Sequence, residues 1–158
     1  MVELSGVSFG YQSDKNVLDN LNLRMEEGRF YGLLGMNGSG KTTLLKLIAG
    51  KLFAHGGEIY VDGRNLRERD VETLQKVFML PADFIFPNMS LEQFLAIYSE
   101  FYPEFRKEVL NDCLVNFEIQ RDIKNLNQLS LGEKHKVAFS IALSLGTKIV
   151  LLDEAANG

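Results

Sequence analysis

A glycine-rich octapeptide, GMNGSGKT at residues 35–42, constrains the fold of this chain more than any other feature. It follows the short apolar segment Phe30–Leu34 and leads into residues 41–52, where leucines and an isoleucine recur with helical spacing. The pattern therefore predicts a strand, a tight glycine loop and a helix in immediate succession. This succession is the context that a phosphate-binding loop requires.

The chemistry of such a loop is specific. Its glycines let the backbone turn so that N–H groups point inward, and the beginning of the helix favours an anion. Lys41 can reach the β- and γ-phosphates of a nucleotide, and the hydroxyl of Thr42 can hold Mg²⁺. The alternative is an ordinary glycine-rich turn with a solvated lysine, which does not account for the strand, the glycines, Lys41 and Thr42 occurring together. The candidate nucleotide-binding residues here are Asn37, Gly38, Ser39, Gly40, Lys41, Thr42 and Thr43.

Composition excludes several other classes of function. The formal net charge of -4 argues against a broad nucleic-acid-binding surface, which needs clustered Lys and Arg. The single cysteine, Cys113, forms no intrachain disulfide and is expected to be buried in a helix. No apolar run approaches the ~18 residues of a membrane span, and the N-terminus does not resemble a signal peptide. We therefore expect a cytoplasmic domain that reaches a membrane only through a partner.

The rest of the chain is expected to alternate between strands and helices. Alternating or fully apolar runs predict strands at residues 2–9, 17–25, 74–81 (stopped by Pro81) and 149–153, and a strand followed by a turn at 57–63. Capping boxes begin two of the predicted helices, which cover residues 90–102, 104–117 and 130–145. Fully apolar strands are typical of a parallel sheet that is covered on both faces. The pattern therefore favours an α/β fold.

Three segments together resemble the ABC ATPase family, in the order in which that family has them. GMNGSGKTTLLKLIAG at 35–50 resembles its Walker A motif, LSLGE at 129–133 its signature motif, and IVLLDE at 149–154 its Walker B motif. The resemblance implies a P-loop NTPase of ABC type with a mostly parallel sheet and an N-terminal antiparallel β subdomain. It also implies a single domain over residues 1–158, with a helical insert at roughly 83–130.

The resemblance implies further site residues. Tyr11 stands where the family places an aromatic ring that stacks on adenine, although an ordinary tyrosine at a strand end would also fit. Asp153 is implied as a Mg²⁺ ligand and Glu154 as the catalytic base, with two solvated acids in a turn as the alternative. Ser130 and Gly132 are implied to contact the γ-phosphate of a nucleotide held by the opposite subunit. The same residues also form part of a helix cap.

The resemblance also implies a function and partners. The expected protein binds MgATP and hydrolyses it as a homo- or heterodimer, driving export through a separate integral-membrane permease at the inner face of the cell membrane. FYPEF at 101–105 and GEKHK at 132–136 resemble bacterial exporters of this kind. The aromatic-rich insert is expected to face the permease through Phe84 and Phe86. A nucleotide-binding remnant without turnover and a soluble, non-transport ABC protein are the alternatives.

The sequence departs from the family pattern in its small motifs. The family's glutamine that senses Mg²⁺ and water is replaced by the run Pro81, Ala82 and Asp83. Leu131 and Glu133 replace a glycine and a glutamine of the signature motif.

The family's histidine beyond Walker B has no counterpart here. His55 and His135 both precede that motif and are expected on the surface. Because the sequence stops at Gly158, we expect the C-terminal strands to be absent and the domain to be incomplete. The expectation is that these 158 residues alone are not a competent ATPase.

Overall fold

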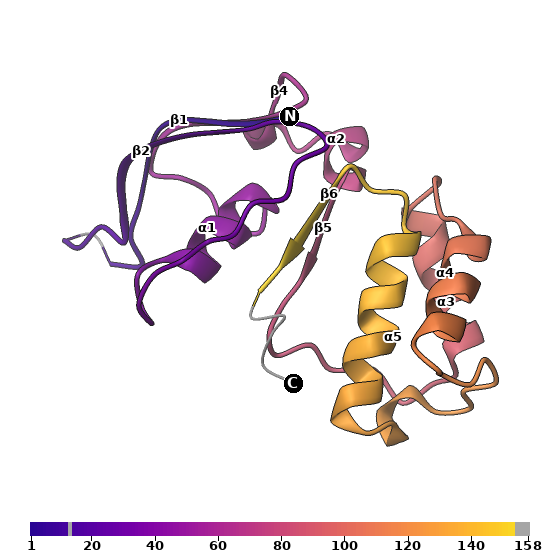
Figure 1. Cartoon of the computed structure of the whole chain (residues 1–158). Helices are drawn as coiled ribbons and strands as arrows, with labels where there is room; N and C mark the ends of the chain where they lie inside the picture. Colours follow the sequence, from indigo (N-terminus) through magenta and orange to yellow (C-terminus); the bar gives the residue numbers. More distant parts are fainter. Residues whose placement is uncertain (13, 154–158) are drawn as a thin grey trace. The chain divides into compact units, whose positions relative to one another are not determined.

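The computed structural model describes residues 1–12 and 14–153 (Figure 1). The chain divides into two compact units, Met1–Val77 and the part that begins at Phe78. Each unit is described by itself below.

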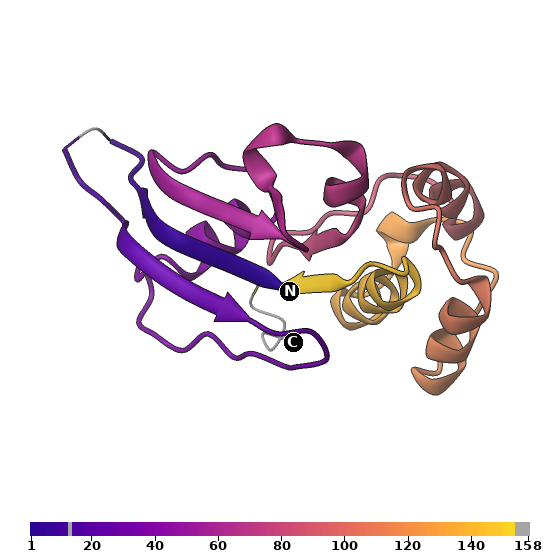
Figure 2. The same cartoon turned by 90° about the horizontal axis from the view of Figure 1, so that it is seen from above.

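The first unit is built on a four-stranded antiparallel sheet. Its strands are β1 (Val2–Phe9), β2 (Leu18–Met25), β3 (Gly56–Val61) and the short β4 (Arg64–Asn65), in the order β2-β1-β3-β4. Figure 2 shows β1 between β2 and β3. Four buried side chains of β1 point to the core: Val2, Leu4, Val7 and Phe9. The strands predicted at 2–9 and 17–25 are confirmed, as is the strand and turn predicted at 57–63, where β3 ends at Val61.

Helix α1 (Lys41–Ile48) lies on one face of this sheet (Figure 1). Its buried side chains are Thr43, Leu44, Leu45, Leu47 and Ile48. The helix is shorter than the predicted 41–52, because the backbone at Gly50 takes a positive φ of 66°, which does not continue a right-handed helix.

Two short helices complete the first unit, η1 (Leu66–Glu68) and α2 (Val71–Gln75). The strand predicted at 74–81 is therefore wrong at its beginning. The side chain of Asp70 accepts a hydrogen bond from the backbone N–H of Thr73 and so caps a helix that includes Leu74.

The second unit has a two-stranded sheet and three longer helices. The strands β5 (Val77–Leu80) and β6 (Ile149–Leu152) are neighbours, and their arrows run the same way in Figure 1. The helices are α3 (Leu91–Phe101), α4 (Lys107–Asn116) and α5 (Leu131–Ser144), with the short η2 (Leu126–Gln128) before α5. The predicted capping boxes, Ser90 with Gln93 and Ser130 with Glu133, are confirmed.

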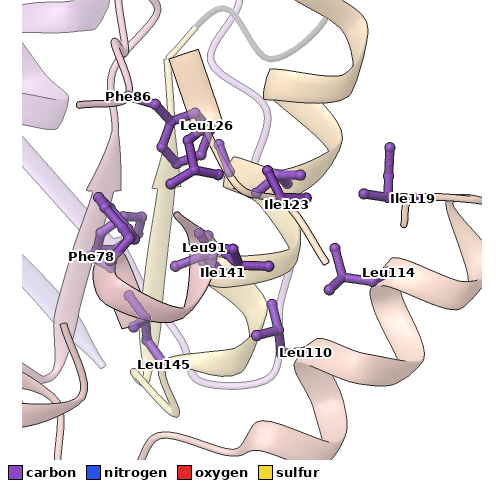
Figure 3. Packing of buried hydrophobic residues seen from close by; sticks show 14 residues of the cluster. Phe78, Phe86, Leu91, Leu110, Leu114, Ile119, Ile123, Leu126, Ile141 and Leu145 are labelled. Atoms are coloured by element: carbon purple, nitrogen blue, oxygen red, sulfur yellow. The ribbon is translucent and has the colours of Figure 1, made fainter. Parts of the chain in front are cut away.

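The core of the second unit joins β5 to all three helices. Figure 3 shows Phe78 of β5, Leu91 of α3, Leu110 of α4 and Ile141 of α5 in one cluster. A row of aromatic contacts joins rings of this cluster to rings packed against it: Phe84, Phe86, Phe94, Tyr98, Tyr102 and Phe78. Cys113 of α4 is half-buried rather than fully buried, and this burial raises the pKa of its thiol.

The prediction that Phe84 and Phe86 face a permease is wrong for Phe86. Its side chain is only 1% exposed and packs edge-on against Phe94, while Phe84 is partly buried against the same core. The side chain between them, Ile85, is 80% exposed. Burying a large aromatic ring is favourable, so the two phenylalanines belong to the core of the second unit.

The strand predicted at Phe30–Leu34 is not formed either. This segment belongs to neither sheet, and Phe30 and Leu34 are almost fully exposed. A strand needs a neighbour for its backbone N–H and C=O groups, and no described strand pairs with this segment. The larger sheet of the described residues is the predicted N-terminal antiparallel β subdomain, and β5 and β6 form a separate two-stranded sheet.

Candidate nucleotide-binding site

The loop before α1 is closed around the side chain of Lys41. The Lys41 ammonium donates to the carbonyl oxygen of Gly35 at 2.8 Å and to that of Met36 at 2.9 Å. The backbone N–H of Ser39 donates to the Met36 carbonyl at 3.2 Å, which tightens the turn. The positive charge is thus held against the backbone of the loop, where a phosphate group would need it.

Two glycines allow this loop. Gly40 is the N-cap of α1 with φ 91°, a conformation that side chains rarely adopt, and a Cβ there would lie 3.1 Å from the side chains of both Val17 and Leu18. A Cβ on Gly35 would lie 2.7 Å from Oγ of Ser39. Substituting either glycine would therefore disturb the loop.

The beginning of α1 is favourable for an anion. No side chain caps it at Gly40, and no acidic residue lies in its first turn. The helix dipole places partial positive charge at this end. The same end carries Lys41, Thr42 and Thr43, three of the residues proposed from the sequence.

The Tyr11 side chain is hydrogen-bonded to the first turn of this helix. Its hydroxyl hydrogen-bonds Oγ1 of Thr43 at 3.1 Å, and its ring meets Phe9 edge-on with a centroid distance of 5.1 Å. The Tyr11 side chain is 62% exposed. A role for Phe9 was not predicted from the sequence, although this last residue of β1 lies only two positions before Tyr11.

The signature segment begins α5 in the second unit. The Ser130 N–H donates to Oε2 of Glu133 at 2.9 Å, and the Glu133 N–H donates to Oγ of Ser130 at 3.3 Å. The hydrogen bonds from Ser130 lower the pKa of the Glu133 carboxyl. Leu131 is 66% exposed, and a Cβ on Gly132 would meet nothing within 4 Å, so this helix end is open.

The Walker B segment begins with the strand β6 in the same unit. The backbone N–H of Asp153 donates to the carbonyl of Leu80 at 3.0 Å. Glu154 lies outside the described residues. In the turn after β5, Ala82 and Asp83 are exposed.

The two histidines differ in exposure. His55 is exposed, as expected, and its ring contacts Phe9 with a centroid distance of 5.0 Å. His135, which was expected on the surface, is half-buried in α5.

The helices of the described residues are all too short or too polar to cross a membrane.

Comparison with known proteins identifies the family of this chain. The model of the family described as "ABC transporter" matches residues 18–157. The chain is 30% identical over 158 residues to the ABC transporter ATP-binding protein YtrB of Bacillus subtilis, covering all of this chain but 53% of YtrB. It therefore spans about half the length of this curated relative.

Solved structures with a similar fold include ATP-binding proteins of ABC transporters. The chain matches a structure described as an ABC transporter (ATP-binding protein) from Pyrococcus furiosus with a TM-score of 0.83 and 31% identity, over 99% of this chain and 76% of that one. It matches a dimeric post-hydrolysis state of the ATP-binding cassette MJ0796, bound to ADP and Pi, with a TM-score of 0.82, 27% identity, and coverage of 99% and 75%.

The fold and the glycine loop define a nucleotide-binding domain of the P-loop class. The chain belongs to the ABC transporter family and is an ATP-binding domain of that family.

Proposed function

We propose that this chain binds MgATP at residues 35–43 and belongs to a protein that hydrolyses it to drive export through a separate permease. The observation that carries the proposal is the position of the Lys41 ammonium, held by the carbonyl oxygens of Gly35 and Met36 at the uncapped beginning of α1. A cation and a helix N-terminus at one loop form a favourable site for a triphosphate.

The donor set fits this ligand. Asn37, Gly38, Ser39 and Gly40 supply backbone N–H groups for phosphate oxygens, and the Tyr11 ring offers a face to the base. Thr42 and Asp153 keep the roles of Mg²⁺ ligands that the family resemblance gives them, since hydroxyl and carboxylate oxygens are the donors this ion prefers. The ion, when bound, neutralises charge on the β- and γ-phosphates.

Hydrolysis needs a group that accepts a proton from the attacking water, and we assign this role to Glu154. Ser130 and Gly132 would serve a second ATPase domain. The first turn of α5 is exposed at Gly132, where the helix dipole favours a γ-phosphate oxygen, while the Ser130 N–H is bonded to the Glu133 carboxylate. The dimer of MJ0796 supports such a pairing, here as a homo- or heterodimer. In this proposal the pair is held at the inner face of the cell membrane by its permease.

The proposal is tested by the order of affinities for adenine nucleotides. Calorimetry on the chain is expected to give the tightest binding for MgATP, weaker binding for MgADP and the weakest for AMP, because Lys41 meets the β- and γ-phosphates. Equal affinity for AMP and MgATP would show that the loop does not bind the phosphate chain.

A further inference from the structure

We infer that Thr43 and Phe9 are positioning residues that hold the ring of Tyr11 over the phosphate loop. The base and the phosphates of a nucleotide would then bind at a fixed distance from each other. The inference rests on the proposed function. It adds that the Tyr11 hydroxyl has a task of its own, which a ring used only for stacking would not need.

The hydroxyl end of Tyr11 is anchored. Tyr11 Oη and Thr43 Oγ1 lie 3.1 Å apart, and Thr43 is only 5% exposed. The Tyr11 side chain as a whole is 62% exposed. A buried partner at one end and solvent along the rest leave a ring that is tethered but still accessible to a flat ligand.

The ring is also supported by Phe9, the last residue of β1. Phe9 is 6% exposed and meets Tyr11 at an interplanar angle of 89°. Edge-to-face contact of this kind is a preferred arrangement of two aromatic rings. The Phe9 ring also contacts the ring of His55, with a centroid distance of 5.0 Å, so Phe9 is itself held in place.

These two contacts come from different elements, so together they fix the Tyr11 ring relative to both. Phe9 ties the ring to the sheet, and Thr43 ties it to the first turn of α1, next to Lys41 and Thr42. A side chain that is already ordered loses less entropy when a ligand binds. The tether should therefore strengthen binding of ligands that carry a base and leave a bare triphosphate unaffected.

The test compares MgATP with magnesium tripolyphosphate, which has no base, by calorimetry on the full chain. Tyr11→Phe keeps the ring and removes the hydroxyl. We expect it to weaken MgATP binding about threefold to tenfold, the range that one hydrogen bond supports, and to leave tripolyphosphate binding unchanged. Tyr60→Phe is the matched control, because the Tyr60 hydroxyl donates instead to Oε2 of Glu58. That variant should change neither affinity.

A double-mutant cycle isolates the pair. In a Thr43→Val background, Tyr11→Phe should have no further effect on MgATP, since the tether is already lost. Thr43→Ser, which restores a hydroxyl, should recover the sensitivity to Tyr11→Phe. Circular dichroism melts establish that each variant is folded.

Three results would overturn the inference: unchanged or tighter MgATP binding by Tyr11→Phe, equal losses for both ligands, or additive effects in the cycle. If the wild-type chain binds neither ligand, the proposed function itself fails. These outcomes are distinct from one another.

Discussion

The Oγ atom of Ser130 lies 2.6 Å from Oε2 of Glu133, and the backbone N–H groups of the two residues are each bonded to the other's side chain. This reciprocal cap begins α5, the helix that carries the signature segment. Two backbone donors that would otherwise lack a helical partner are satisfied in this way.

Ser130→Ala removes the cap and should destabilise the fold by about 0.5–2 kcal/mol, the usual value of an N-cap side chain. The free energy of unfolding is measured with urea. Ser99→Ala, inside α3, is the control and should be neutral or slightly stabilising, because alanine is the better helix former. Equal losses in both variants would contradict the capping role.

The same pair predicts a dependence on pH. The pKa of Glu133 is lowered, chiefly by the side-chain hydrogen bond from Ser130. A carboxyl whose folded pKa is lowered stabilises the fold above its unfolded pKa of about 4.3, and this contribution is lost as the pH falls through the folded value. NMR titration of Glu133 should show its pKa rising in Ser130→Ala. An unchanged pKa would show that the hydrogen bond is not its cause.

Phe86 and Ile85 should respond oppositely to truncation. Phe86→Ala removes a side chain that is 1% exposed and should cost about 3–5 kcal/mol, whereas Ile85→Ala, at a side chain 80% exposed, should change stability by less than about 0.5 kcal/mol. Thermal melts of both variants decide this. A larger loss for Ile85→Ala would mean that Ile85, not Phe86, belongs to the core.

Glu154→Gln is expected to keep MgATP binding and to lose turnover, because the amide cannot accept a proton. Phosphate release should fall to background, on the shortest length of the protein that hydrolyses ATP. ATP should then hold a dimer together in size-exclusion chromatography, since the pair is no longer released by hydrolysis. Turnover at the wild-type rate would show that another residue is the general base, with Asp83 as the first candidate.

Local patterns predicted local structure well. Ser90 with Gln93 and Ser130 with Glu133 specify helix starts through contacts only three residues apart, and both caps are present. The alternation in Val2–Phe9 likewise specifies a strand with one buried face. Such contacts need no knowledge of the rest of the chain.

Features that depend on distant partners were predicted less well. The apolar run Phe30–Leu34 indicates a strand, but pairing requires a neighbour, and no described strand supplies one. Phe86 and Ile85 are both apolar, and only packing against Phe94 decides which is buried. The contact between Tyr11 and Thr43 joins residues 32 positions apart and leaves no periodic signal in the sequence.

The central claim, that residues 35–43 bind MgATP, is tested most directly by calorimetry on Lys41→Ala beside Lys46→Ala. Both variants lose one positive charge from α1, but Lys46 lies in its last turn, away from the loop. Lys41→Ala should weaken MgATP binding at least about tenfold, the effect of losing a charged hydrogen bond to phosphate, while Lys46→Ala should bind as the wild type does. Unchanged affinity in Lys41→Ala, or equal losses in both variants, would contradict the account.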